Sequence, residues 1–143
     1  MGTTDWLDSL IDSLINNWVG VLLGVGVGVG APVLLAVLMI LVRFPVDTPL
    51  TLILTELSIG AAGFVAAWWS REDALASTIV HGVSTALICA FLSLVAAVLA
   101  NPMGTSPLGV LFLFVSYALM GGLGGVVVWF IEGQRGRGEI ERW

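Results

Sequence analysis

The sequence contains no lysine, a single cysteine and a single histidine, and only 10% of its 143 residues are charged. Soluble globular domains carry about 25% charged residues, so this composition excludes that class. The lone Cys89 excludes an intramolecular disulfide. Because one cysteine and one histidine form neither a metal-ligand pattern nor a Ser/His/Asp constellation, we expect no metal, no cofactor and no enzymatic activity.

Positive charge is also scarce, with five arginines against ten acidic residues and a net charge of −5. Three of the arginines fall in the last ten residues, interleaved with Glu139 and Glu141. Nucleic-acid binding proteins need a concentrated basic face, so this interaction is not expected. The acidic, lysine-free, Gly/Val/Ala-rich composition favours a halophilic archaeal source, and chance in a small, mostly buried chain is the alternative.

Four long apolar runs make up most of the chain, and each has the ~20 residues that a bilayer crossing needs. They predict transmembrane helices over residues 18–42, 50–70, 74–100 and 108–131. Pro32 predicts a kink in the first of them. The expected fold is therefore all-α, a bundle of four transmembrane helices in a lipid bilayer.

The two ends of the chain are more polar than these runs. Residues 4–17 alternate apolar side chains with Asp5, Asp8 and Asp12 at helical spacing. This pattern predicts a short amphipathic helix at the membrane surface. The expected organisation is an interfacial helix over 1–17, a membrane domain over 18–132 and a polar C-terminal tail over 133–143.

Arginine placement predicts the orientation, because cytoplasmic loops are enriched in Lys and Arg. With both termini in the cytoplasm, four arginines lie inside and only Arg43 lies outside. The reverse orientation places those four on the outer side. We therefore expect a multi-pass protein of the cell membrane with cytoplasmic N- and C-termini.

Glycines line three of the predicted helices, and small residues let transmembrane helices approach closely. In the first helix Gly20, Gly24 and Gly28 share one face, while Gly26 and Gly30 lie nearly opposite. Shorter stripes lie on the second helix (Gly60 and Gly63) and on the fourth (Gly121 and Gly125). Two glycine faces on one helix indicate neighbours on both sides, so we expect a homo-oligomer or an accessory subunit of a membrane complex. The stripes on the second and fourth helices suffice to pack the bundle internally, so we expect Gly26 and Gly30 to face the partner.

Three ionisable side chains fall within the apolar runs, namely Glu56, His81 and Glu132. Such residues are candidates for ion or proton pathways, and we place Glu56 and His81 roughly 9 Å apart along the bundle at ~1.5 Å per residue. One interpretation is an ion channel or proton-coupled transporter. The other is hydrogen bonding between helices, with Thr85 or Tyr117 as partner of Glu56, and Ser77 or Thr85 as partner of His81.

Part of the chain resembles small haloarchaeal four-helix membrane proteins of unassigned function. The resemblance covers Gly60-Ala-Ala-Gly-Phe-Val-Ala-Ala-Trp68, the charged turn Arg71-Glu-Asp73 and Ile79-Val-His-Gly82. Those proteins share a GG-x-x-A-G-Y helix end, where this sequence has Trp in place of Tyr. The resemblance implies a four-helix membrane fold and no particular activity.

A second resemblance is to the proteolipid ring subunit of rotary ATPases. It rests on the alternating glycines of the first helix, the turn Arg43-Phe-Pro45 and the carboxylate of Glu56. Glu56 lies only about two turns into its helix, whereas the carboxylate of the ring lies near mid-membrane. Residues 74–131 do not repeat the glycine alternation or a mid-helix carboxylate.

Overall fold

The computed structural model describes residues 3–43, 49–70, 74–101, 104 and 106–140. These residues form helices and no strands, which confirms the all-α prediction. In chain order the helices are α1 (Thr3–Asn16), α2 (Trp18–Leu41), α3 (Pro49–Ser70), α4 (Leu75–Ala100) and α5 (Pro107–Ile140). A short helix therefore precedes four long ones, as expected.

The four long helices match the predicted membrane spans closely. Each is long and apolar enough to cross a membrane, with α5 meeting these criteria over Pro107–Gln134. The chain is thus a small multi-pass membrane protein in its architecture. The difference is at the C-terminal end, where α5 continues to Ile140 instead of ending near residue 131. Glu, Gln and Arg are good helix formers, so the polar segment extends the helix although it also contains glycines.

Local sequence explains two of the helix ends. At the start of α5, the Gly109 backbone N–H donates to the Ser106 hydroxyl over 3.0 Å, and Pro107 occupies the first helical position. This is the favoured arrangement of a Ser N-cap followed by proline. After α2, Arg43 adopts a left-handed conformation with φ of 55°. Left-handed residues commonly terminate helices, so α2 ends here. Pro32 lies inside α2, and the helix runs through it unbroken.

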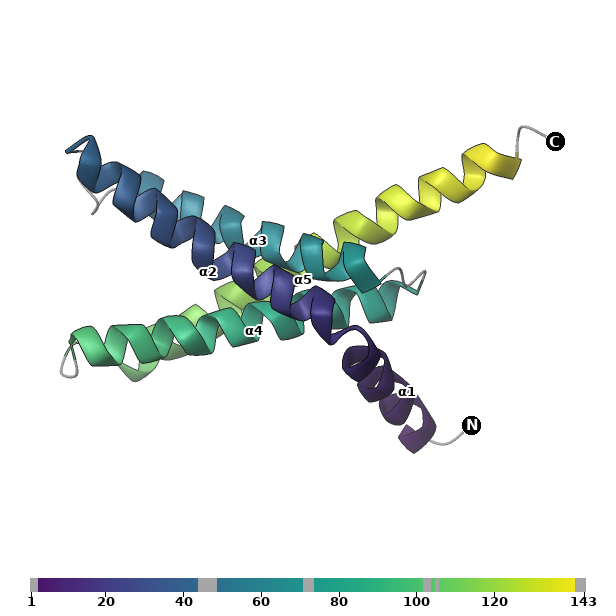
Figure 1. Cartoon of the computed structure of the whole chain (residues 1–143). Coiled ribbons are helices and arrows are strands. Elements are labelled where there is room, and N and C mark those ends of the chain that lie inside the picture. Colours follow the sequence, from purple (N-terminus) through teal and green to yellow (C-terminus); the bar gives the residue numbers. More distant parts are fainter. Residues whose placement is uncertain (1–2, 44–48, 71–73, 102–103, 105, 141–143) are drawn as a thin grey trace.

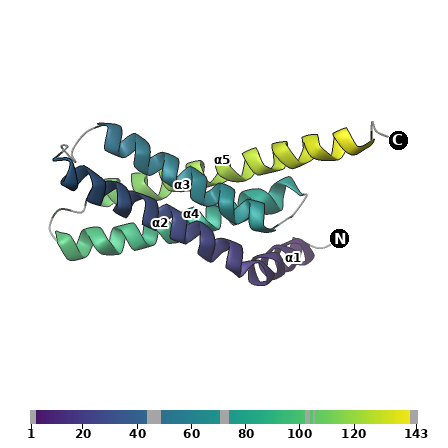
Figure 2. The ribbon, with the colours of Figure 1, turned by 45° about the horizontal axis from the view of Figure 1, so that its top comes forward.

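The helices α3 and α4 form the centre of the bundle (Figures 1 and 2). Each of them packs against the other and against both α2 and α5. Among the described residues α2 and α5 do not contact each other, and α1 contacts only α2 and α4. The outer helices α2 and α5 therefore each have one face turned away from the bundle.

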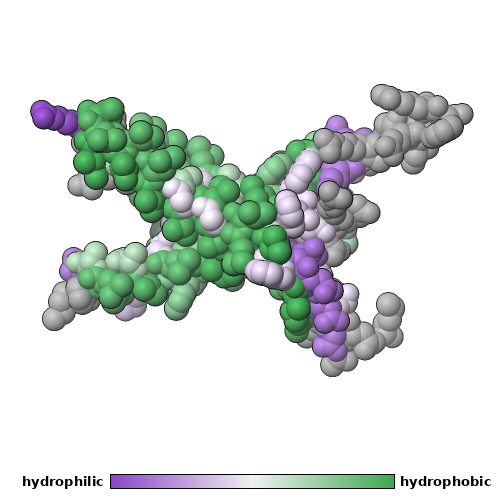
Figure 3. All heavy atoms as spheres, in the orientation of Figure 1, coloured by the Kyte–Doolittle hydropathy of each residue, from purple (hydrophilic) through white to green (hydrophobic). Residues whose placement is uncertain are grey.

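Most of the buried residues lie in one half of the bundle, called the packed half below, and Met39 on α2 is buried outside it. The largest fully buried side chains lie on α3, α4 and α5: Ile59, Thr78, His81, Thr85, Cys89 and Val128. No described residue of 49–58, 91–101 or 107–116 is buried. In this second half the α2–α3 hairpin and the α4–α5 hairpin diverge (Figure 1). On the face shown in Figure 3, the surface of both hairpins is mainly hydrophobic, whereas hydrophilic residues lie on α1.

Candidate functional site

The backbones of α3, α4 and α5 meet at glycines in the packed half. A Cβ atom at Gly63 or at Gly82 would collide with the Gly121 carbonyl oxygen. A Cβ at Gly124 or Gly125 would likewise collide with backbone atoms of α3 or α4. Helices approach this closely only where side chains are absent. The α5 glycines and their partners therefore form the central crossing of the bundle.

The inner face of α2 is also filled. A Cβ atom at Gly24 would lie 2.6 Å from the Ala62 carbonyl oxygen and 2.7 Å from the Thr85 side chain. At Gly20 it would lie 2.9 Å from the Trp69 Cβ, and at Gly28 it would lie 2.7 Å from the Cys89 Sγ. These three glycines thus hold α2 against α3 and α4.

The opposite face of α2 is open. Apart from the local α2 backbone and the adjoining residues, no atom of residues 3–43, 49–70, 74–101, 104 or 106–140 lies within 4 Å of the position of a Cβ at Gly26 or at Gly30, and both residues are exposed. A Cβ at Gly60 on α3 would lie 3.6 Å from the Met120 side chain, an ordinary van der Waals distance. Gly60 is therefore neither tightly packed nor open. The two glycine faces inferred from the sequence therefore differ in the structure: one packs within the chain, and the other faces outward.

His81 is completely buried on α4, and only one of its ring nitrogens has a partner. Its Nδ1 lies 2.9 Å from the Ser77 carbonyl oxygen, which can only accept. In this arrangement Nδ1 carries the hydrogen and Nε2 presents a lone pair. No partner reaches Nε2 among the described residues, and such an unsatisfied buried atom calls for a water, an ion or a functional explanation.

A polar chain connects His81 to the N-terminal helix. The Ser77 hydroxyl lies 3.5 Å from His81 Nδ1 and 3.3 Å from the hydroxyl of Ser13 on α1. The Thr85 hydroxyl instead donates to the His81 carbonyl oxygen over 2.8 Å. Of the two partners expected for His81, Ser77 bonds its ring and Thr85 bonds its backbone.

Glu56 lies on α3 near the point where the hairpins diverge. It is partly buried, and its buried Oε2 atom has no hydrogen-bonding partner in the described part of the chain. Its neighbour across the bundle is Tyr117 of α5, and Ser93 of α4 lies beside the same phenol group. Tyr117 was one of the two expected neighbours of Glu56. The other, Thr85, lies elsewhere, beside Gly24.

The three ionisable residues are not brought together. Gly24 lies against both Ala62 and Thr85, so these two residues are level, and Glu56 is then ~15 Å from His81 along the axes at ~1.5 Å per residue. This is more than the ~9 Å expected from the sequence. Glu132 lies near the polar end of α5, partly buried, with an Oε2 atom that has no partner among the described residues.

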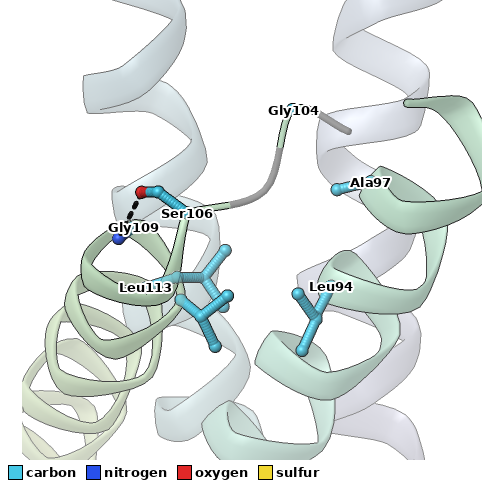
Figure 4. Close-up of a pocket in the computed structure, with 7 residues that line it drawn as sticks. Leu94, Ala97, Gly104, Ser106, Gly109 and Leu113 are labelled. Carbon is cyan, nitrogen blue, oxygen red and sulfur yellow. Dashed lines mark hydrogen bonds between the residues drawn. The ribbon is translucent and has the colours of Figure 1, made fainter. Parts of the chain in front are cut away.

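Other features of the structure offer few reactive or ligand-binding groups. A hollow of about 200 Å³ lies between α4 and α5 at their connection, and its labelled polar group, the Ser106 hydroxyl, already caps α5 (Figure 4). Cys89 is buried as a free thiol against α2. The described residues include no group of three metal-ligating side chains.

Sequence reasoning missed two of these contacts. The Ser13–Ser77 contact joins segments 64 residues apart, and Ser93 was not identified as a neighbour of Tyr117. The sequence signal for these contacts is the spacing of serines on α1 and α4. Serines are common on helix surfaces and packing faces, so this spacing alone does not predict a contact.

The described residues thus form a protein with four helices able to span a membrane, in which Glu56, His81 and Glu132 each have one buried atom without a hydrogen-bonding partner. Comparison with protein-family models, curated proteins and solved structures finds no match to this chain.

Proposed function

We propose that this small membrane protein assembles with copies of itself through the outer face of α2. The observation that carries the proposal is the contrast between its two glycine faces. Gly20, Gly24 and Gly28 pack against α3 and α4, whereas a Cβ at Gly26 or Gly30 would have no packing neighbour within 4 Å among the described residues. An internal glycine costs a helix roughly 0.5–1 kcal/mol relative to alanine, so the two open glycines have no benefit inside one chain.

The outer face fits a second copy of itself. Gly26 and Gly30 are separated by three residues, the spacing at which two transmembrane helices pack in close contact. Large exposed side chains flank them on the same face, including Leu23, Val33 and Leu34. A two-fold dimer uses the same patch on both subunits, and α2 can approach a partner because α5 does not cover it. Service as an accessory subunit of a larger complex would use the same face.

Gly26→Leu combined with Gly30→Leu should convert the assembled protein into a monomer, because two leucines prevent close approach of the helices. The molar mass of the purified protein in mild detergent, measured by light scattering, reports the change. Ala31→Leu is the matched control, since Ala31 is exposed on a different side of α2. A monomeric wild-type chain, or an unchanged mass in the double variant, would contradict self-assembly.

The orientation proposed for this assembly has both termini in the cytoplasm, supported by the positions of the arginines. In a Cys89→Ala background, a membrane-impermeant thiol reagent added to intact cells should label Asp47→Cys and should not label Gly133→Cys. The reverse labelling pattern would show that the arginine bias does not set the topology of this protein.

A second candidate function is proton or ion movement across the membrane. The specific observation is that, in the part of the chain that the structure describes, the buried side-chain atoms without partners belong to Glu56, His81 and Glu132, the ionisable groups within the apolar runs. Unpaired polar atoms in hydrocarbon are costly. A pathway would require water or further groups between them, because Glu56 and His81 are ~15 Å apart at ~1.5 Å per residue. The test is a measurement of proton flux into liposomes, which should be lost when His81 is substituted.

A further inference from the structure

The N-terminal helix leaves the line of α2 at a bend at Asn17. The backbone angles of this residue, φ of −107° and ψ of 21°, depart from helical values. Two hydrogen bonds hold the bend, since the Asn17 backbone N–H and its side-chain amide donate to the Ser13 carbonyl oxygen over 3.0 Å and 3.1 Å. The Ser13 hydroxyl also lies 3.3 Å from the Ser77 hydroxyl of α4. The short helix is therefore bent away from the axis of α2 and joined to α4 (Figures 1 and 2).

A hollow of about 350 Å³, called the α1 hollow below, lies between α1, α2 and α4 at this bend. The side chains that line it are aliphatic or aromatic, apart from one serine. Its walls are formed by Leu14 and Ile15 of α1, Trp18 and Leu22 of α2, and Ser84 and Ile88 of α4. Ligand pockets in proteins have volumes of roughly 300–1,000 Å³, so the α1 hollow is large enough to hold part of an apolar molecule.

The α1 hollow opens outward at one end of a membrane span. Of the side chains that line it, Ile15 is 62% exposed, Trp18 is 58% exposed and Leu22 is 57% exposed. The span of α2 begins at Trp18, and tryptophan is enriched where a membrane meets water. An empty apolar space loses dispersion contacts, and a water molecule finds few polar partners in it. The hydrocarbon chain of a membrane lipid is therefore the occupant that fits this position.

The polar face of α1 places negative charge beside the α1 hollow. Asp8 and Asp12 are exposed, and exposed aspartates are charged at neutral pH. Residues three or four apart lie on the same side of a helix, so Asp12 lies one turn from Ile15 in the wall of the hollow, and Asp8 lies one turn further. Interfacial helices usually carry Lys and Arg on the polar face, whereas residues 1–18 contain neither. A lipid headgroup above the hollow therefore meets an acidic surface.

We propose that the α1 hollow binds one hydrocarbon chain of a membrane lipid, and that Asp8 and Asp12 select a lipid whose headgroup carries an ammonium group. The chain enters beside Trp18 and fills the space between the three helices, while the headgroup stays at the polar face of α1. The two carboxylates attract the ammonium group and repel anionic headgroups. The hollow includes neither Gly26 nor Gly30, so this site does not depend on self-assembly.

A lipid chain suits the α1 hollow better than a protein segment or a polar ligand does. A helix with its side chains is about 10–12 Å across, and a space of about 350 Å³ can take only a few of its side chains. A polar ligand would leave most of its groups without hydrogen bonds, because the lining offers only the Ser84 hydroxyl and the Trp18 indole N–H. A single flexible hydrocarbon chain needs no such partners.

The test uses a phosphatidylcholine and a phosphatidylglycerol that carry the same photoreactive diazirine chain. The full chain is irradiated in nanodiscs containing either lipid, and the labelled residues are located by mass spectrometry. Labelling of the α1 hollow is divided by labelling around Phe112, which is 74% exposed on α5 and reports ordinary contact with lipid. We expect this ratio to be about threefold higher for phosphatidylcholine at low salt, as suits two exposed charges. High salt should reduce the difference by screening.

Matched variants separate the hollow from the charge. Ser84→Phe, which fills the α1 hollow, should lower the ratio for both lipids. Leu99→Phe is its control, because Leu99 is 79% exposed elsewhere on α4, and it should leave the ratio unchanged. Asp8→Asn with Asp12→Asn should remove the difference between the two lipids. Asp47→Asn, in the connection between α2 and α3, should retain that difference.

Each result decides a part of the proposal. An unchanged ratio in Ser84→Phe would overturn the binding of a chain in the α1 hollow. Equal ratios for the two lipids in the wild type, or a difference that persists in the Asp8→Asn, Asp12→Asn variant, would overturn the selection of the headgroup. The thermal unfolding temperature of each variant identifies a misfolded protein. If Ser84→Phe misfolds, Val21→Phe narrows the same hollow from α2 and should lower the ratio in its place.

Discussion

Gly121→Ala should destabilise the protein by about 3 kcal/mol or more, because overpacking a tight core costs this order of free energy. The added methyl group would collide with the Ala86 side chain and with the Gly82 carbonyl oxygen on α4. Both belong to a rigid neighbouring helix, and one is backbone, so neither can rotate aside. The expected result is a lower temperature of thermal unfolding in mild detergent and a smaller yield of monodisperse protein.

Gly122→Ala is the matched control for this prediction. The next residue on the same helix has only the Val83 side chain near its Cβ position, at an ordinary 3.4 Å. Replacing glycine by alanine in a helix interior stabilises it by roughly 0.5–1 kcal/mol, so this variant should be as stable as the wild type or slightly more stable. Equal loss of stability in the two variants would show that α5 does not cross α3 and α4 at Gly121.

His81→Ala should lower the stability by about 2–4 kcal/mol, as large-to-small changes at buried positions do. The side chain is 0% exposed, and the change also removes its bond to the Ser77 carbonyl. His81→Leu should stay within about 1.5 kcal/mol of the wild type, because it keeps most of the volume and removes the unpartnered Nε2. Thermal unfolding of both variants in the same detergent measures these differences.

The leucine variant also separates the two interpretations of His81. A folded His81→Leu protein without proton flux in liposomes, where the wild type conducts, would assign His81 to a pathway. An unchanged flux, or a wild type with none, would leave His81 as a hydrogen-bonding group of the α4 backbone. The alanine variant cannot make this distinction, since a lost flux could follow from its lower stability.

The positions of the transmembrane helices could be predicted from the sequence, because hydrocarbon excludes unpaired backbone groups and favours long apolar helices. Thus α2 and α4 end within one residue of their expected bounds. The continuation of α5 to Ile140 was missed. Hydropathy locates the limit of the membrane, and a helix can continue past that limit when its residues have adequate helix propensity.

The candidate site was predicted in part. The ionisable residues could be selected from their positions in apolar runs, and helical periodicity separated the two glycine faces of α2. Gly26 and Gly30 could be predicted to face outward, because the small-residue stripes of α3 and α5 suffice to pack the bundle, and the structure leaves these two glycines open. The heights of Glu56 and His81 were inaccurate, because they depend on how α2, α3 and α4 interlock at Gly24, and a count of residues from the connecting turn omits this contact.

The position of α2 has a consequence for the order of events during synthesis. Its contacts at Gly20, with Ala66 and Trp69, involve only the first 70 residues of the chain. The α2–α3 hairpin can therefore close before α4 leaves the ribosome. The α4–α5 hairpin then packs against a surface that α2 and α3 have already formed.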